Sequence, residues 1–531
     1  MSVNVITYDV GTTGIKTCIF EISDTIKLIM AAVEGYQLYI EENGGAEQDL
    51  KEIWNAMCST TIKVIDNSKI SPDSIQGISF CSQMQGLVLV DKNGEPVRRL
   101  MSYMDQRARR ELKEGMGNGL KISGVNFLKL LKSIKITGAV AASVKDPVWK
   151  YNWVKRNEPE NFKRVYKWLD VKEYLIFKCT GNFIMTKDSA FGTMLFDIRK
   201  GKNCFSSKMC KLLGVNMEHL PQIAGCSDKV GLLTEKAAVQ LHLKAGTPVF
   251  GGGGDASLIG VGAGAVSMGS THIYSGTSGW VSTVVNKRVL DITSMIASII
   301  GADDNSYNYF AELETAGKCL EWVKNHLALD EINIYLQKIC VSDSLESLYV
   351  NLYDFMLEEI KNIPAGSHGV IFTPWLHGNR CPFEDSLARG MFFNISLETG
   401  KRDLIHAVME GICYHLRWQL EAQRKKVKTS KAIRFVGGGA LSPLTCQTMS
   451  DILGCEIETV DSPQNVGALG AAVIVAVGLG ILERMEDADK LITVKEVYVP
   501  NTANKEIHDR NFVVFKSLYK NNKRAFRIMN K

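Results

Sequence analysis

The chain has 531 residues, of which 45% are apolar and 22% charged, and its formal net charge is +5. These values are ordinary for a soluble globular protein, and the length indicates more than one domain. The small net charge, without a basic stripe carrying interleaved aromatics, argues against a nucleic-acid partner.

Cysteine usage and apolar runs restrict the protein class further. The thirteen cysteines include no Cys-x-x-Cys pair, which argues against zinc and against a disulfide framework. With no leader at the start, the cysteines favour a reduced, cytoplasmic setting. The apolar run 466–482 is shorter than the roughly 20 residues that a membrane helix needs. We therefore predict a buried core helix there, no membrane partner, and a solvated helix face over 516–531.

The first 90 residues predict strands and one helix. Segments 6–10 and 15–22 read as the strands of a hairpin, and apolar residues recur at helical spacing over 50–65. Two further strands are predicted over 75–80 and 87–90, the second closed by an Asp-Lys-Asn-Gly turn.

The middle of the chain changes character. Residues 110–225 are predicted to be mostly helical, and the aromatic side chains of 149–177 are interpreted as core. A strand over 247–250 leads into four consecutive glycines and Asp255. We place the domain junction there, which predicts domains over 1–253 and 254–531.

The second half again alternates strands and helices. Leucine, valine and isoleucine stand at every fourth position over 404–420, which predicts a long amphipathic helix. A strand is predicted over 433–436, and another over 456–460. Between them Ser442 is a good N-cap and Pro443 a good first helical residue. This alternation predicts an α/β fold.

One hairpin signature occurs twice, about half the chain apart. A β-type run leads into Gly11-Thr12-Thr13-Gly14 and a second run leaves it, and the pattern returns around Gly276-Thr277-Ser278-Gly279. Glycines let backbone N–H groups approach an anion, and the hydroxyls add donors. We therefore expect two halves built on one plan, each offering a phosphate-binding turn to a shared nucleotide cleft.

Charged residues flank the first turn. Asp9 would repel a phosphate unless a Mg²⁺ ion lay between them, held by carboxylate, water and phosphate oxygens. Lys16, on the returning strand, is placed to reach a phosphate. The alternative interpretation is a plain hairpin with a capping aspartate and a surface lysine.

Asp255 follows the four glycines, an arrangement suited to backbone that passes close to a ligand or another strand. A carboxylate there could act as a general base for a hydroxyl that attacks a γ-phosphate. The alternative is a flexible hinge. The first turn lacks Walker A spacing. The glycines of 437–439 could accommodate a nucleoside, or form only a tight strand-to-helix turn.

Taken together, these segments resemble the FGGY carbohydrate kinases of the actin-like ATPase superfamily, and among them the xylulokinases. The resemblance covers essentially the whole chain. It rests on eight segments in the family's order: 9–16, 82–86, 103–107, 253–255, 276–278, 376–382, 402–411 and 437–442. It implies two ribonuclease-H-like domains with a central nucleotide and substrate cleft.

The resemblance also implies roles for particular residues. The catalytic residues would be Asp255 as base and Asp9 as the carboxylate associated with Mg²⁺. ATP would be bound by Gly11, Thr12, Thr13, Lys16, Gly276, Thr277, Ser278, Gly438, Gly439, Ala440 and Ser442. The sugar would be bound by Gln83, Met84, Gln85, Tyr103, Asp105, Arg107, Asp255 and Ala256. Family analogy alone suggests a homodimer.

The sugar-contact segments depart from the xylulokinase pattern. Gln85 stands where xylulokinases have His, Ala256 where they often have Asn, and Tyr103 where they have Trp; Ser82 replaces Gly. Loss of hydrogen-bond partners to hydroxyls can change discrimination by about 10⁴-fold. Phosphorylation of D-xylulose to xylulose 5-phosphate is the best single expectation. The alternatives are ribulose, gluconate, erythritol or glycerol.

Two other function classes are alternatives to a kinase. A non-catalytic sugar sensor on the same fold would bind sugar without forming a product, but Asp9 and Asp255 are both present. A dinucleotide-binding oxidoreductase would use 260–265 as a Gly-x-Gly-x-x-Ala fingerprint, yet no acid stands near position 280.

Overall fold

The computed structural model describes residues 2–117, 119–122, 125–303, 305–328 and 356–530. Contacts divide the chain into two compact units. The first comprises Met1–Gly262, Ile300–Ser306 and Val466–Ile492, and the second comprises Ala263–Ile299, Tyr307–Asn465 and Thr493–Lys531. A late segment of the chain therefore belongs to the first unit, while the boundary predicted at 253/254 stays a prediction.

The first unit is built on one mixed sheet with the strand order β16-β17-β6-β1-β2-β3, and β18 pairs with β6. Strands β1, β2 and β3 form an antiparallel meander, whereas β6 runs parallel to β1. The strands are β1 (Val3–Val10), β2 (Gly14–Ile22), β3 (Ile26–Gly35), β6 (Ile75–Ser82), β16 (Lys229–Leu232), β17 (Pro248–Phe250) and β18 (Gly253–Gly254).

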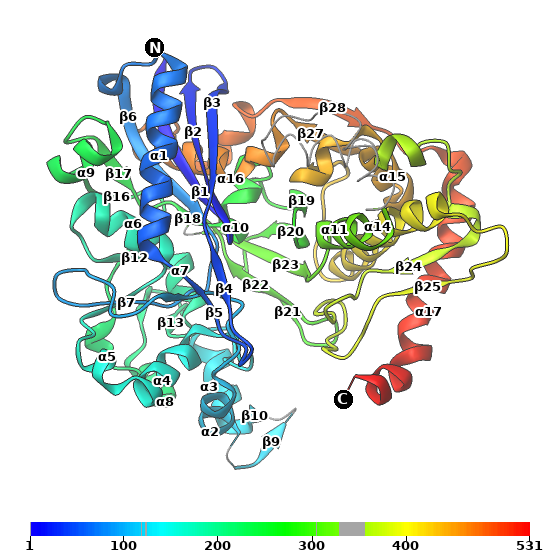
Figure 1. Ribbon diagram of the computed structural model, residues 1–531, viewed down its shortest axis with the longest axis horizontal. Helices are drawn as coiled ribbons and strands as arrows, with labels where there is room; N and C mark the ends of the chain where they lie inside the picture. Colours follow the sequence, from blue (N-terminus) through cyan, green and yellow to red (C-terminus); the bar gives the residue numbers. More distant parts are fainter. Residues whose placement is uncertain (1, 118, 123–124, 304, 329–355, 531) are drawn as a thin grey trace. The chain divides into compact units, whose positions relative to one another are not determined.

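Helix α1 (Leu50–Ser68) covers part of this sheet. Its first turn is capped by Asp49, whose carboxylate accepts a hydrogen bond from Lys51 N–H. The helix packs on β2 and β3, and Figure 1 shows it lying along these strands. Its apolar positions recur at helical spacing and are buried, as the sequence predicts.

The other helices of the first unit are mostly short. They are α2 (Arg109–Met116), α3 (Phe127–Ile136), α4 (Pro147–Asn157), α5 (Pro159–Lys163), α6 (Val171–Thr180), α7 (Lys187–Gly192), α8 (Ser207–Leu213), α9 (Glu235–Leu241), α10 (Asp255–Gly262) and α16 (Val466–Gly478). The minor strands are β4 (Leu38–Ile40), β5 (Ala46–Gln48), β7 (Val88–Val90), β8 (Leu100–Met101), β9 (Lys121–Ile122), β10 (Val125–Asn126), β11 (Lys167–Leu169), β12 (Ile184–Thr186), β13 (Phe196–Asp197), β14 (Cys204–Phe205) and β15 (Gln222–Ala224).

The second unit repeats the strand plan of the first. Its sheet has the order β21-β22-β23-β20-β19-β26-β27-β28. Strands β19, β20 and β23 form an antiparallel meander, β26 runs parallel to β19, and β27 runs parallel to β26. Across the second sheet the order β23-β20-β19-β26-β27-β28 thus matches the order β3-β2-β1-β6-β17-β16 across the first. The prediction of two halves on one plan is confirmed at the level of sheet topology.

The second unit contains the predicted hairpin, strands and helices together with further elements that were not predicted. The strands are β19 (Thr271–Ser275), β20 (Gly279–Val285), β21 (Leu290–Asp291), β22 (Ile296–Ile300), β23 (Tyr307–Leu313), β24 (Ile371–Thr373), β25 (Met391–Phe393), β26 (Ile433–Val436), β27 (Ile457–Val460) and β28 (Val494–Tyr498). The helices are α11 (Gly317–Val323), α14 (Lys401–Arg424), α15 (Pro443–Leu453) and α17 (Lys505–Met529).

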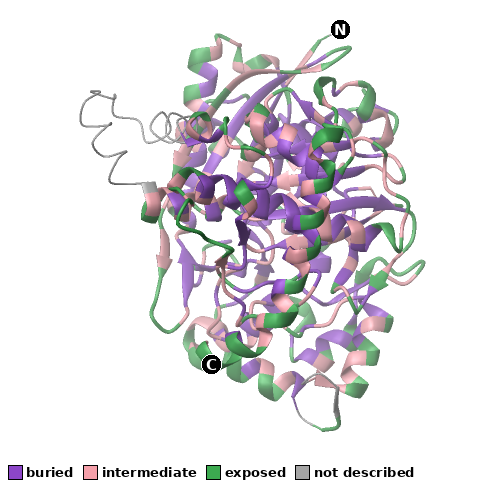
Figure 2. Ribbon diagram, turned by 90° about the vertical axis from the view of Figure 1, so that its right-hand side faces the viewer, coloured by how far each residue is buried: buried purple, intermediate pink, exposed green. Residues whose placement is uncertain are grey.

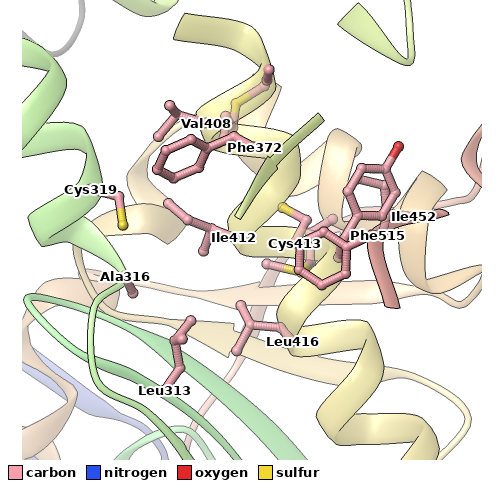
Figure 3. Packing of buried hydrophobic residues seen from close by; sticks show 14 of the residues in the cluster. Leu313, Ala316, Cys319, Phe372, Val408, Ile412, Cys413, Leu416, Ile452 and Phe515 are labelled. Carbon is pink, nitrogen blue, oxygen red and sulfur yellow. The ribbon is translucent and has the colours of Figure 1, made fainter. Parts of the chain in front are cut away.

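Helix α14 is the long amphipathic helix predicted from the spacing of its apolar residues. Figure 3 shows Val408, Ile412 and Leu416 in the apolar cluster that also holds Leu313 of β23 and Phe372 of β24. Their transfer from water, about 25 cal/mol per Å² of apolar surface, contributes to the stability of this unit. Helix α15 begins as predicted, with Ser442 Oγ accepting a hydrogen bond from Thr445 N–H.

Burial tests two further interpretations. Trp149, Tyr151, Trp168 and Tyr174 are buried in the first unit and form core, whereas Tyr166 is exposed, so the interpretation of the 149–177 aromatics as core is wrong for that residue. Helix α16 is buried from Val466 to Ala476, as expected for a core helix. Figure 2 shows the buried residues concentrated on the strands, with exposed residues on the outer helices. Among the described residues, no helix combines the length and apolarity needed to cross a membrane.

The dinucleotide fingerprint is not supported by the fold. Gly260 and Gly262 lie inside α10, whereas the fingerprint requires glycines in the turn between a strand and a helix. This alternative is therefore wrong.

Candidate active site

Three neighbouring parallel strands of the first unit bring the predicted chemical groups together. Asp9 on β1 is paired in register with Cys81 on β6, and Cys81 is paired with Gly253 on β18. Adjacent strands lie about 4.8 Å apart, so Asp9 and Asp255 emerge near the same sheet edge. Ligands of open α/β sheets bind outside the carboxyl ends of the strands.

The carboxylates of Asp9 and Asp255 both lie near the thiol of Cys81. Burial raises the pKa of Cys81 well above its ordinary value, and the charges of Asp9 and Asp255 raise it further. Both carboxylates therefore lie within electrostatic range of one buried atom. Sequence reasoning placed them in one site, and the structure brings them together.

Asp9 fits a magnesium ion that a nucleotide would bring. Burial raises its pKa, and the charge of Lys16, its partner across the hairpin, counteracts that effect. The first turn of α16 reaches the same carboxylate, since a Cβ on Gly467 would stand 2.8 Å from Asp9 Oδ2. Among the described residues no group of three or more His, Cys, Asp or Glu could hold a metal. One carboxylate with phosphate oxygens and water is a common Mg²⁺ arrangement.

The first predicted phosphate turn is held in place through its carbonyl groups. Gly11 N–H donates to Gly14 O at 2.9 Å, which closes the turn. The Tyr36 hydroxyl donates to Gly11 O, and Gln48 Nε2 donates to Thr12 O at 2.7 Å. Thr13 is exposed. Because the carbonyls of Gly11, Thr12 and Gly14 accept hydrogen bonds from the protein, the conformation of the turn is fixed. A turn held in this way suits a preformed anion site.

Two of the four glycines before Asp255 pass close to other backbone, one of the two reasons predicted for them. A Cβ on Gly252 would overlap the carbonyl oxygen of Phe80 on β6, and one on Gly251 would stand 2.6 Å from Gly225 O. The glycines are buried, so the flexible-hinge interpretation is wrong. Asp255 is the first residue of α10, and its Oδ1 accepts a hydrogen bond from Ala256 N–H at 2.7 Å.

A buried ion network that sequence reasoning missed supports this segment. Asp188 Oδ2 accepts from Gly254 N–H at 2.7 Å, and Lys172 Nζ donates to Gly251 O at 3.2 Å. Thr186 Oγ1 joins the two, because it accepts from Lys172 Nζ and donates to Asp188 Oδ1. Burial raises the pKa of Asp188, but the Lys172 charge and these hydrogen bonds outweigh burial and lower it. An ionised Asp188 thus fixes the backbone next to Asp255.

The segment after β6 carries the predicted sugar contacts. Gln83 N–H donates to Val10 O at 2.8 Å, and Gln83 Nε2 donates to Gln48 Oε1 at 2.8 Å. Gln48 in turn donates its Nε2 to the carbonyl of Thr12, which fixes the orientation of both amides. Gln83 Oε1 is then left buried with no hydrogen-bond partner among the described residues. An acceptor of this kind fits a ligand hydroxyl.

The residues beside Gln83 are also close to the site. Gly254 lies against Met84, because a Cβ there would overlap the Met84 side chain. Gln85 has a left-handed backbone with φ of +63°, and it lies next to Gly192.

The Tyr103–Arg107 segment reaches the first turn. Thr12 Oγ1 lies 3.4 Å from the Tyr103 hydroxyl. Asp105 is fully buried, and its Oδ2 accepts from Ala46 N–H and from the Arg107 guanidinium. Arg107 also donates to Glu47. These bonds hold Asp105 and Arg107 in a buried ion cluster, and their contact with sugar stays a prediction.

The second turn, in the other unit, is fixed in a similar way. Gly276 N–H donates to Ser278 O at 2.9 Å, and the carbonyl of Gly276 accepts from Gly317 N–H at 2.8 Å. Thr277 is exposed. The first residue of α11 thus supports this turn, as Gln48 and Tyr36 support the first one.

The predicted adenosine turn lies beside the second phosphate turn. A Cβ on Gly437 would stand 2.6 Å from Ser275 O, the residue before Gly276. Gly438 is exposed, and a Cβ there would meet no atom of the described part of the chain within 4 Å. Ala440 points into the apolar core. The segment is both a tight strand-to-helix turn and an accessible glycine surface.

The segment 402–411, another of the eight that carry the family resemblance, has a structural role. Glu410 of α14 is buried, and it accepts hydrogen bonds from Gly366 N–H at 2.7 Å and from the Ser367 hydroxyl at 2.8 Å. Burial raises its pKa to about 7. The segment therefore ties α14 to the loop before β24.

Comparison with known proteins identifies the family. Residues 4–262 match the N-terminal domain of the FGGY family of carbohydrate kinases, and residues 272–479 match its C-terminal domain. The chain is 29% identical to a xylulose kinase of Staphylococcus epidermidis, over 97% of this chain and 96% of the relative. It is 25% identical to a gluconokinase of Bacillus subtilis, over 91% and 89% of the two chains.

A solved structure confirms the fold. The ligand-bound xylulose kinase of Lactobacillus acidophilus superposes with a TM-score of 0.83, at 24% identity over 98% of this chain and 99% of that one. The predicted two-domain α/β fold of the actin-like ATPase type is therefore confirmed. The chain belongs to the FGGY family of carbohydrate kinases, enzymes that phosphorylate sugars with ATP.

Proposed function

We propose that the acceptor of this kinase is D-xylulose and that the product is xylulose 5-phosphate. The similarity to xylulose kinases extends along nearly the whole chain. The observation that carries the proposal is the register of β1, β6 and β18, because Asp9 lies on β1 while the predicted sugar contacts and Asp255 directly follow β6 and β18. A kinase needs these three parts close together.

Asp255 is proposed as the general base. It would take the proton of a sugar hydroxyl while that oxygen attacks the γ-phosphorus of ATP, and ADP would leave in line. Mg²⁺ associated with Asp9 would neutralise charge on the phosphates. Gly11, Thr12, Thr13 and Lys16 would contact phosphate oxygens, as would Gly276, Thr277 and Ser278. Gly438, Gly439, Ala440 and Ser442 would border the adenosine.

The sugar would lie beside the segment after β6. Gln83 would accept a hydrogen bond from a sugar hydroxyl through its unpartnered Oε1. Met84, Gln85, Tyr103 and Ala256 would form the remaining surface, with Asp105 and Arg107 behind it. Gln85 and Ala256 differ from the xylulokinase pattern, so another ketose, a polyol or a sugar acid such as gluconate is the second candidate.

A coupled ATP-consumption screen with purified protein tests the proposal. The panel contains D-xylulose, L-xylulose, ribulose, gluconate, glycerol and erythritol, each with MgATP. The highest kcat/KM with D-xylulose supports the proposed acceptor, and a higher value with another compound replaces it. Sugar binding by calorimetry with no phosphorylated product would instead indicate a sensor.

Replacement of Gln83 by leucine is expected to raise the sugar KM about tenfold or more, because the sugar hydroxyl loses its buried acceptor. The KM for ATP should change far less. Gln76→Leu is the matched control, since Gln76 is exposed on β6, the strand that directly precedes Gln83. Equal sugar KM values in the two variants would remove Gln83 from the sugar site.

A further inference from the structure

One peptide group in the sugar-contact segment is held from both sides by buried charged residues. The carbonyl of Gln85 accepts a hydrogen bond from Lys150 Nζ at 2.8 Å. The next N–H, that of Gly86, donates to Asp170 Oδ2 at 3.1 Å. Lys150 comes from α4, and Asp170 is the N-cap of α6. Two helices that lie far from Gln85 in the sequence therefore hold the plane of the Gln85–Gly86 peptide.

This peptide is strained. Gln85 has a φ of +63°, a left-handed conformation that is unfavourable for a residue with a side chain. Such a conformation persists only where surrounding contacts over-determine it. Gly86 is required beside it, because a Cβ there would stand 3.1 Å from the Leu100 side chain and overlap the Asp170 carboxylate. The direction of the Gln85 side chain thus depends on these contacts.

The two residues that hold this peptide, Lys150 and Asp170, are buried charged groups. Lys150 is fully buried, an expensive position for an ammonium group. Burial lowers its pKa to about 8, and the nearby charges of Asp105, Asp170 and Asp146 oppose that shift while Lys145 adds to it. Lys150 therefore contacts one predicted sugar segment, at the Gln85 carbonyl, and lies within electrostatic range of Asp105 in the other.

Asp170, which accepts the hydrogen bond from Gly86 N–H, is also a buried charged group. Burial raises its pKa to about 7, the charge of Glu173 raises it further, and Lys150 and the amides of Val171 and Gly86 lower it. Its Oδ1 also caps α6 by accepting from Val171 N–H at 2.7 Å. Asp170 therefore also stabilises the start of α6. A variant at this position must keep that cap while it weakens the bond to Gly86 N–H.

We propose that Lys150 and Asp170 are positioning residues that clamp the Gln85–Gly86 peptide and so determine how Gln85 meets the sugar. The inference rests on the proposed function, because Gln85 is a sugar contact only in that proposal. Gln85 stands where xylulokinases carry His, so the clamp would set which acceptor fits this enzyme. Neither anchor touches the sugar, and both act through the backbone of Gln85.

The test compares Lys150→Met with Lys150→Arg and Asp170→Asn. Asparagine keeps the cap of α6 and most of the shape. The expected result for Lys150→Met is a sugar KM about tenfold or more above wild type, with the ATP KM within about twofold. Lys150→Arg should recover part of the loss, and the kcat/KM ratio between two acceptors that differ at one hydroxyl should change. Lys155→Met is the matched control, since Lys155 is exposed on the same helix.

A second measurement needs no sugar. Hydrogen–deuterium exchange of the ligand-free protein should be faster at peptides covering 83–88 in Lys150→Met and Asp170→Asn, and unchanged in Lys155→Met. Unchanged exchange there overturns the clamp, as does a sugar KM that stays at the wild-type value or rises only in step with the ATP KM. If the wild-type protein phosphorylates no carbohydrate, the proposed function fails while exchange still decides the clamp.

Discussion

Asp255→Ala is expected to reduce sugar-dependent ATP consumption by about 10²–10⁴-fold, because the hydroxyl that attacks phosphorus loses its proton acceptor. Binding of a non-hydrolysable ATP analogue should remain close to wild type, since no phosphate contact is proposed for this side chain. Steady-state kinetics and calorimetry on the same preparations measure the two quantities. A loss in kcat with little change in either KM is the signature of an interaction made in the transition state.

Two further variants make this result specific. Asp255→Asn keeps the volume and an acceptor for Ala256 N–H, so a similar loss there assigns the effect to the charge and basicity. Asp66→Ala is a control on the exposed face of α1 and should keep full activity. If Asp255→Asn turned over at near the wild-type rate, another group would have to accept the proton.

Elements whose signals are local could be predicted from the sequence. The strand Ile433–Val436 has the predicted limits, and α15 begins with the predicted Ser442 cap and Pro443. Both hairpins form where a β-type run meets a glycine turn. In each case the information lies within a few residues, in apolar periodicity, capping side chains and glycines.

Features that depend on distant contacts could not be predicted. No pattern around Lys150 or Asp188 distinguishes them from surface residues, and each becomes significant only because the fold buries it against a backbone group. Gln48 likewise matters only through Thr12 and Gln83. Helix α16 was predicted as a core helix, but not that it packs on α10 in the first unit. Such pairings are set by tertiary packing.

Gly252→Ala is expected to destabilise the first unit by about 3 kcal/mol or more, from two causes that act together. The residue has a φ of +64°, which costs an alanine roughly 1–2 kcal/mol. The new Cβ would also overlap the Phe80 carbonyl and stand 2.9 Å from Phe80 N, and overpacking typically costs about 1–3 kcal/mol. Thermal and urea unfolding measure the loss. Because β6 would have to move away from Gly253, kcat should fall as well.

Gly246→Ala separates the two causes. Gly246 has a φ of +83°, but its Cβ would meet no atom within 4 Å in the residues that the structure describes, so this variant carries the backbone strain without the overlap. It should lose only about 1–2 kcal/mol and keep its kcat. Equal losses in the two variants would show that backbone strain alone explains them, and that β6 yields to a methyl group. A larger loss for Gly252→Ala, accompanied by a lower kcat, would mean that close contact between two backbones holds Asp255 in place.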